Sequence, residues 1–204
     1  MITLAFDTCL DKTYITLSDD NKIIKSEIIK SDKENYHSAY LISTIVKILK
    51  SASLKPNDIG CIVTDIGPGS FTGIRACTAV ARVLAQQLNI KTIGVSSLEI
   101  LSKVLGDNDM VVLDARKNKA YVYDGKVLGA IELEEADELV KNRVVVTDNS
   151  LLERISKNAY KAISYQVGDF RLGDILSVIA RGKESKNWQE LKPLYIQPPP
   201  VFGK

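Results

Sequence analysis

The sequence GPGSFTGIR, at residues 67–75, joins a predicted strand to a predicted helix. Residues 61–66 form a short apolar run rich in β-branched side chains, which is typical of a buried strand. Residues 72–88 contain no proline and many alanines, which predicts a helix. The glycines permit a sharp turn, and Ser70 or Thr72 can cap the helix. A strand, a glycine loop and a helix N-terminus in this order form a candidate anion site.

The candidate anion or nucleotide site has a second part at the end of the first predicted strand. We expect Asp7 and Thr8 of that strand to lie with Ser70, Thr72 and Gly73 of the loop. The alternative is a tight turn without a ligand. The loop is not a Walker A motif, because no Lys-Ser/Thr pair follows its last glycine, and its G-x-G-x-x-x-G spacing is not that of a Rossmann fingerprint.

Composition limits the possible classes of protein. The chain has 204 residues, 45% of them hydrophobic, and can bury one large core or two small ones. Its net charge is +2 and no basic block stands out, so we do not expect it to bind a nucleic-acid backbone alone. His37 is the single histidine, which excludes a metal site with two histidines and makes a Ser-His-Asp triad improbable.

Cysteine usage and hydropathy predict a cytoplasmic protein. The three cysteines are Cys9, Cys61 and Cys77, and none forms a C-x-x-C pair. Met1 leads directly into an apolar strand pattern with no signal peptide, so we expect reduced thiols in the cytoplasm. No apolar run approaches the roughly 20 residues that span a bilayer, and we therefore expect no membrane contact.

The predicted elements follow one order twice. Three strands, a helix, a strand, a helix, a strand and a short helix fill residues 1–106, and a shorter version of the same order fills residues 107–204, ending in an extended tail. We therefore predict an α/β fold of two βββαβα lobes. Duplication of this ribonuclease-H-like unit is the architecture of the actin and Hsp70-like ATPases. The first lobe would hold the GPGSFTG loop and the interface helices.

Aspartates end matching strands in the two halves. In actin-like ATPases, aspartates placed like Asp7 and Asp114 flank nucleotide phosphates, but here no glycine-rich turn follows either residue. A second possibility is a ribonuclease-H-like nuclease, in which Asp7 and Asp65 would end adjacent strands and share metal ions. That chemistry usually needs further converging carboxylates, so both enzyme classes remain alternatives.

The two helices of the first half carry more apolar surface than one sheet can bury. A surplus stripe of this kind indicates contact with another subunit, the alternative being burial against the second half of the chain. On residues 72–88, a second apolar stripe holds Ala76, Ala79, Val80 and Val83, and the sequence does not say which stripe faces the partner. The predicted interface residues are Leu41, Ile45, Ile48, Ile74, Cys77, Ala81, Leu84 and Ala85.

Taken whole, the GPGSFTGIR stretch resembles the signature of the bacterial TsaB (YeaZ) family. Residues 67–75 match the family's GPGSFTGxR at every fixed position, and most of the first half is similar to the family. Ala39 and Gln197 stand where the family usually has glutamate and arginine, and the second half is shorter than usual. Further similar segments are Leu4–Thr8, His37-Ser38, Ser96–Glu99, Asp114–Lys117 and Pro193–Tyr195.

The resemblance implies a non-catalytic scaffold subunit in the synthesis of threonylcarbamoyladenosine (t6A). Its homologous partner TsaD would carry the metal-binding histidines and transfer the threonylcarbamoyl group to A37 of tRNAs reading ANN codons. The ATPase TsaE would complete the complex. ATP and a metal ion are expected on these partners, with no cofactor on this chain, and tRNA is expected to contact it only indirectly. Alone, the chain is expected to form a homodimer.

Overall fold

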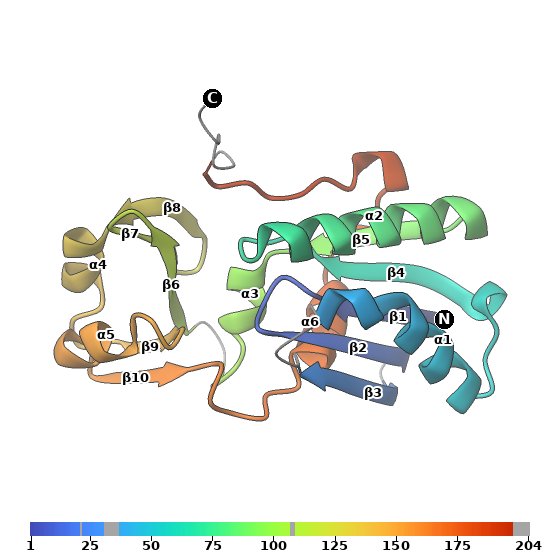
Figure 1. Cartoon of the computed structure of the whole chain (residues 1–204), viewed down its shortest axis with the longest axis horizontal. Coiled ribbons are helices and arrows are strands. Elements are labelled where there is room, and N and C mark those ends of the chain that lie inside the picture. Colours follow the sequence, from blue (N-terminus) through green and yellow to red (C-terminus); the bar gives the residue numbers. More distant parts are fainter. Residues whose placement is uncertain (21, 31–36, 107–108, 198–204) are drawn as a thin grey trace. The chain divides into compact units, whose positions relative to one another are not determined.

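The chain folds into two compact units, each built on one five-stranded sheet (Figure 1). The computed structural model describes residues 1–20, 22–30, 37–106 and 109–197. The first unit comprises Met1–Ser97 and Arg171–Leu194, and the second comprises Leu98–Phe170 and residues 195–197.

The sheet of the first unit has the strand order β3-β2-β1-β4-β5. The first three strands form an antiparallel meander, while β4 pairs parallel to β1 and β5 parallel to β4. This is the 3-2-1-4-5 order of a ribonuclease-H-like sheet. The strands are β1 (Ile2–Asp7), β2 (Lys12–Asp19), β3 (Lys22–Lys30), β4 (Ile59–Asp65) and β5 (Lys91–Val95).

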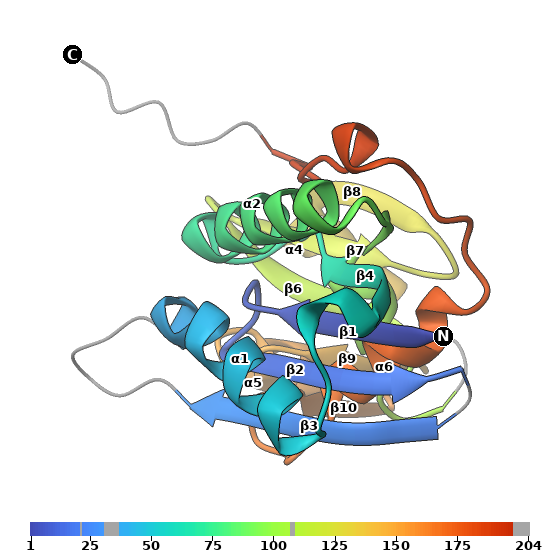
Figure 2. The same cartoon turned by 90° about the vertical axis from the view of Figure 1, so that its right-hand side faces the viewer.

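Helices cover both faces of this sheet (Figure 2). On one face lie α1 (Leu41–Ser51) and α2 (Phe71–Leu88), whose buried residues share a core with Leu4, Phe6 and Ile62 of the strands. On the other face lies α6 (Leu172–Ala180), where Ser177 bonds Ser18 of β2 at 2.7 Å. Successive side chains of a strand point to opposite faces of the sheet, so each face presents a different set of side chains to the helices that cover it.

The second unit repeats the arrangement of the first. Its sheet has the order β10-β9-β6-β7-β8, which is the same 3-2-1-4-5 pattern read from β8. The repeat confirms the predicted duplication of a βββαβα unit. The strands are β6 (Met110–Arg116), β7 (Lys119–Tyr123), β8 (Val127–Glu132), β9 (Val144–Thr147) and β10 (Lys161–Ser164), and the helices are α4 (Leu133–Leu139) and α5 (Leu152–Asn158), with α3 (Ser97–Leu101) between the two sheets in sequence.

The compact units differ from the predicted division at residue 106. Helix α6 was expected in the second lobe but packs on the first sheet, because its apolar side faces β1 and β2. Gly173 permits this close approach, since a Cβ there would lie 2.7 Å from Thr16 Oγ1.

One predicted helix start lies outside the described residues, and another differs by one residue. The S-x-x-E pattern at residues 31–34 predicts a capping box there, and the described part of this region begins with the 3-10 turn η1 (His37–Tyr40) before α1. Helix α2 begins at Phe71, and Ser70 is its N-cap, with the Ser70 hydroxyl accepting from Gly73 N at 3.3 Å. Among the described helices, none has the length and hydropathy needed to cross a bilayer.

Candidate functional site

Two aspartates end the central parallel strands of the first sheet. Asp7 of β1 and Asp65 of β4 directly follow the paired residues Phe6 and Thr64, and both are fully buried. Asp65 accepts hydrogen bonds from Gly67 N at 2.7 Å and from the Ser97 hydroxyl at 2.7 and 2.8 Å. Asp7 Oδ1 accepts from Cys9 N at 2.5 Å, whereas Asp7 Oδ2 is buried and has no partner among the described residues.

Burial changes the protonation of this pair. It raises the pKa of Asp7 well above its usual range, and the nearby charge of Asp65 adds to the effect. Burial also raises the pKa of Asp65, to about 6, although the hydrogen bonds from Ser97 and Gly67 oppose the shift. Two buried carboxyl groups this close favour one proton held on Asp7 beside an ionised Asp65.

The GPGSFTG loop packs directly on the turn that follows β1. Ser70 N donates to Cys9 O at 2.7 Å, and the Thr8 hydroxyl donates to Gly73 O at 2.8 Å. A Cβ on Gly73 would lie 1.8 Å from Thr8 O, which leaves no space for any side chain. The loop and turn therefore form one packed unit.

This packing determines the role of the predicted anion site. The structure joins Thr8 to Gly73 and Ser70 to Cys9, two residues after Asp7, but the N–H groups of Ser70 and Gly73 bind acceptors of the chain itself. Thr72 lies exposed on the first turn of α2. Because both aspartates are also buried, the geometry favours the alternative of a tight turn without a ligand over a phosphate or two-metal site.

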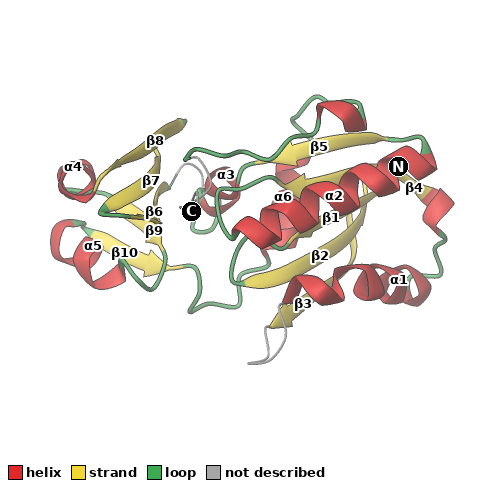
Figure 3. Ribbon diagram, turned by 45° about the horizontal axis from the view of Figure 1, so that its top comes forward, coloured by secondary structure: helices red, strands yellow, loops and turns green. Residues whose placement is uncertain are grey.

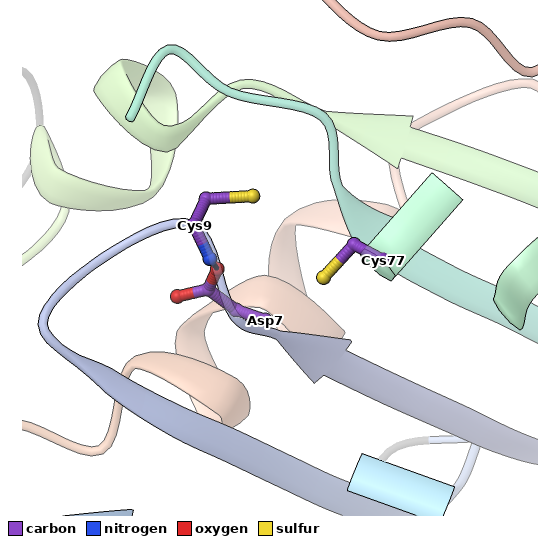
Figure 4. Close-up of side chains that lie close together, drawn as sticks. All are labelled: Asp7, Cys9 and Cys77. Atoms are coloured by element: carbon purple, nitrogen blue, oxygen red, sulfur yellow. Dashed lines mark hydrogen bonds between the residues drawn. The ribbon is translucent and has the colours of Figure 1, made fainter. Parts of the chain in front are cut away.

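A cluster that the sequence did not predict lies beneath α2 (Figure 4). A ligand atom from each of Asp7, Cys9 and Cys77 lies within 4.8 Å of the other two, and all three residues are buried. Thr8 N donates to Cys77 Sγ at 3.1 Å, and Cys9 Sγ donates to Asp65 O at 3.6 Å. These residue types can bind a soft metal, but here they already hold the turn and the helix together.

The protonation of the two thiols differs. Burial raises the pKa of Cys9 well above its usual range. Burial also acts to raise the pKa of Cys77, but hydrogen bonds from Cys9, Thr64 and Thr8 lower it overall. No sequence spacing predicts this cluster, because Cys9 and Cys77 are far apart in the chain and meet only through the packing of the loop.

An apolar groove lies between α1 and α2 on the outer side of the first unit. Its volume is about 270 Å³ and its lining is entirely apolar. Ile42, Val46 and Val83 are 62%, 46% and 56% exposed there, although large apolar side chains are usually buried. The groove is lined by Ile42, Ile45, Val46, Leu49, Pro56, Ile59, Ala79, Val80, Val83, Leu84 and Leu88.

The position of the groove shows that most of the predicted interface residues belong instead to the core. Six of them face the sheet, since each is at most 3% exposed and belongs to the core of the first unit: Leu41, Ile48, Ile74, Cys77, Ala81 and Ala85. Ile45 and Leu84 of the same prediction do line the groove. The second stripe of α2, with Ala79, Val80 and Val83, is therefore the one available to a partner. A helical wheel of α2 shows two apolar stripes, but it does not show which of them the sheet covers.

The aspartates of the second unit lie in a more open setting. Asp148 Oδ2 accepts from Asp114 N at 2.7 Å, and Arg116 Nη1 lies 3.2 Å from Asp114 Oδ2. Arg116, Lys117 and Asn118 all have positive φ values at the hairpin that follows β6. Asp114 was predicted to end its strand, but β6 continues to Arg116, and Asp114 is paired with this basic residue of its own hairpin.

The two repeated sheets place the chain in the actin-like α/β class, built from ribonuclease-H-like units. A sequence model of the family "TsaD: tRNA N6-adenosine threonylcarbamoyltransferase" matches residues 23–184. The chain belongs to this family, and its curated relatives and similar solved structures place it in the TsaB (YeaZ) branch.

Curated relatives carry the name "tRNA threonylcarbamoyladenosine biosynthesis protein TsaB". The protein from Buchnera aphidicola (Baizongia pistaciae) is 34% identical over 59% of this chain and 55% of its own length. The protein from Bacillus subtilis is 34% identical over 59% of this chain and 53% of its own length. The chain therefore spans about half the length of the curated relatives it matches.

Solved structures confirm the fold over nearly the whole chain. YeaZ from Pseudomonas aeruginosa superposes with a TM-score of 0.73 and 19% identity, covering 95% of this chain and 99% of that one. A second structure, described as similar to peptidase YeaZ from Pseudomonas aeruginosa, gives a TM-score of 0.78 with 20% identity, covering 96% and 99%.

Proposed function

We propose that this chain is a non-catalytic partner subunit in t6A biosynthesis that binds the catalytic subunit TsaD through the groove between α1 and α2. The observation that carries the proposal is the wholly apolar lining of that groove. Exposed apolar patches of monomeric proteins are often interaction sites, because their burial is favourable by about 25 cal/mol per Å².

A helical partner surface suits the shape of this groove. Ala79 and the other small residues of α2 permit close approach of another helix, while Ile42 and Val83 project on either side. TsaD is a homologue by the family relationship, so its own two helices at the equivalent position would give a pseudo-symmetric contact of four helices. Interfaces of related subunits commonly use the same surface of both partners.

The sequence supports the non-catalytic part of the proposal. His37 is the single histidine, so the chain lacks the residues for a metal site with two histidines. Asp7 and Asp65 are buried and internally bonded, which disfavours the alternative of a free-standing phosphotransferase or nuclease. Under this proposal ATP and a metal ion would be bound by the partner subunits.

The remaining components follow from the same proposal. TsaE would join as the ATPase of the complex, and A37 of tRNA would be modified at the TsaD site. Without TsaD, two copies of this chain would cover their grooves by pairing through the same surface, which makes the homodimer and the TsaD complex mutually exclusive.

Co-purification with TsaD of the same organism tests the proposal. Wild-type chain should elute with TsaD as one complex in size-exclusion chromatography. Val83→Glu places a charge in the groove and should abolish the complex, whereas Val178→Glu, at a helical valine 52% exposed elsewhere in the same unit, should not. If TsaD binds both variants as it binds the wild type, the groove is not the binding surface.

A further inference from the structure

The segment that follows α6 lies along the open edge of the first sheet. Thr92 N donates to Lys186 O at 2.9 Å and Lys186 N to Thr92 O at 2.8 Å, which adds a short antiparallel pairing to β5 (Figure 3). Further on, Leu194 N donates to Ile66 O at 2.8 Å. Residues 181–194, called the edge segment, are therefore held by backbone hydrogen bonds to Thr92 of β5 and to Ile66, which follows β4.

Two adjoining hollows follow the edge segment. One has a volume of about 420 Å³ and includes Lys91, Arg181 and Lys183 in its lining. The other has a volume of about 340 Å³ and includes Lys183, Lys186 and Lys192. Because Lys183 and Ile93 line both hollows, the five basic residues form one continuous strip.

The positive charges of this strip exceed its negative charges. The acidic residues that line the two hollows are Asp20, Glu184 and Glu190. Asp20 Oδ2 is already 3.0 Å from the amino-terminal nitrogen, and Glu190 Oε1 accepts from Asn187 N at 3.2 Å. Five cations against three carboxylates leave a net positive strip on a chain whose overall charge is only +2.

Four of the five cations, Lys91, Arg181, Lys186 and Lys192, are available to a ligand. Arg181, Lys186 and Lys192 are exposed, and none has an ion pair within the part of the chain that the structure describes. Lys91 Nζ donates to the neutral amide oxygen of Asn187 at 2.6 Å, and no carboxylate of the described residues pairs with it.

We infer that this strip binds the phosphodiester backbone of RNA. The cations are distributed along two hollows and do not converge on one point, which suits a polymer with repeated charges better than a single small anion. The inference rests on the proposed function, because it gives the tRNA substrate a direct contact with this chain in place of the purely indirect one expected from sequence. The strip does not appear as a basic block in the sequence, because Lys91 is ninety residues away from Arg181.

The isolated full-length chain and a fluorescently labelled tRNA transcript that reads an ANN codon provide the test. Fluorescence anisotropy between 50 and 200 mM salt yields the affinity and its salt dependence. The test variant combines Arg181→Gln, Lys186→Gln and Lys192→Gln. The control variant combines Lys22→Gln, Lys47→Gln and Lys50→Gln, three exposed lysines of the same unit, and loses the same charge.

The test variant should bind at least tenfold more weakly at 50 mM salt, with a salt slope smaller by about 2 to 3, since each lost phosphate contact reduces the slope by roughly 0.7 to 0.9. The control variant should retain affinity within about twofold of the wild type. An equal loss of affinity in both variants would mean that only net charge matters and would overturn the inference. Absence of tRNA binding by the wild type would also overturn it.

The same assay distinguishes RNA binding from the binding of a small anion. If tripolyphosphate binds the wild type and fails to bind the test variant, while RNA binds neither, the strip is a small-anion site and the RNA inference is wrong. The assay contains no TsaD, so a failed TsaD co-purification leaves this result intact, and a failed RNA titration leaves the TsaD proposal intact.

Discussion

Helix α2 has two apolar sides with different surroundings. Ala81 on the inner side is fully buried against the sheet, and Cys77 on the same side contacts Thr8 of the turn after β1. Ala79 and Val83 on the outer side line the groove, and Val83 is 56% exposed. The inner side is covered by the chain itself, whereas the outer side has an equally apolar composition and is not covered by any of the described residues of the first unit. An excess of apolar side chains on a helix therefore identifies an interface only when the side chains buried in the core are known, because only the remaining exposed ones can contact a partner.

The largest expected effect is on the inner side of α2. Ala81→Arg would place an unpaired charge in a core position and should unfold the first unit, since such a burial costs several kcal/mol, comparable to the whole stability of a domain. Circular dichroism should show loss of the cooperative thermal transition. A folded Ala81→Arg chain would contradict the assignment of this side to the core.

The next effect concerns the first turn of α2. Gly73→Val should destabilise the chain by more than about 3 kcal/mol, because the Cβ would collide with the backbone carbonyl of Thr8 and the turn would have to move. Gly182→Ala is the control, because the nearest atom to its Cβ would be Ile179 O at 3.8 Å. Urea denaturation measures both, and equal midpoints would show that the loop does not need this close packing.

The buried pair beneath the inner side of α2 predicts a pH dependence. The folded pKa of Asp65 is about 6, above the ordinary value of 3.8, and that of Asp7 is raised further in the same direction. The unfolded chain therefore releases these protons first, and stability should fall as the pH rises from about 4 through 6 and above, by up to about 3 kcal/mol for Asp65.

Asp7→Asn sharpens this prediction. The amide cannot ionise, and its oxygen can still accept from Cys9 N, so the variant should lose less stability than the wild type between pH 5 and pH 8. Urea denaturation at both pH values measures the difference. Parallel pH profiles of variant and wild type would mean that the pair does not titrate in this range.

The smallest effect on stability is expected on the outer side of α2. Val83→Ser should change the free energy of unfolding by less than about 0.5 kcal/mol, because the side chain is already more than half exposed. The same variant should weaken association with TsaD at least tenfold. A stability loss as large as that of a core substitution would indicate that the outer side is covered within the chain.

The sequence was sufficient for most of the fold, and the reasons are local. Alternating strands and the glycine loop at residues 67–75 each have a recognisable pattern, and the order of strands and helices recurs in the two halves. Helix α6 was assigned to the wrong sheet because an amphipathic pattern indicates that a helix has an apolar side but not which sheet covers it.

The functional surfaces could not be predicted from sequence patterns alone. Most of the predicted interface residues proved to be core, because both sides of α2 are apolar and only the sheet distinguishes them. The contact of Cys9 with Cys77 and that of Lys91 with the edge segment join residues distant in sequence, for which a single sequence contains no signal. The GPGSFTG signature was informative about the family, although its glycines serve packing in this structure.

The central claim is that the outer side of α2 binds TsaD, and Ala79→Arg tests it most directly. Ala79 is exposed in the groove, so the arginine should be solvated in the free chain and leave the fold intact. Sedimentation velocity of the variant with and without TsaD should show a folded monomer in both cases, whereas the wild type should sediment as a complex with TsaD. Unchanged sedimentation of the Ala79→Arg chain with TsaD would contradict the account.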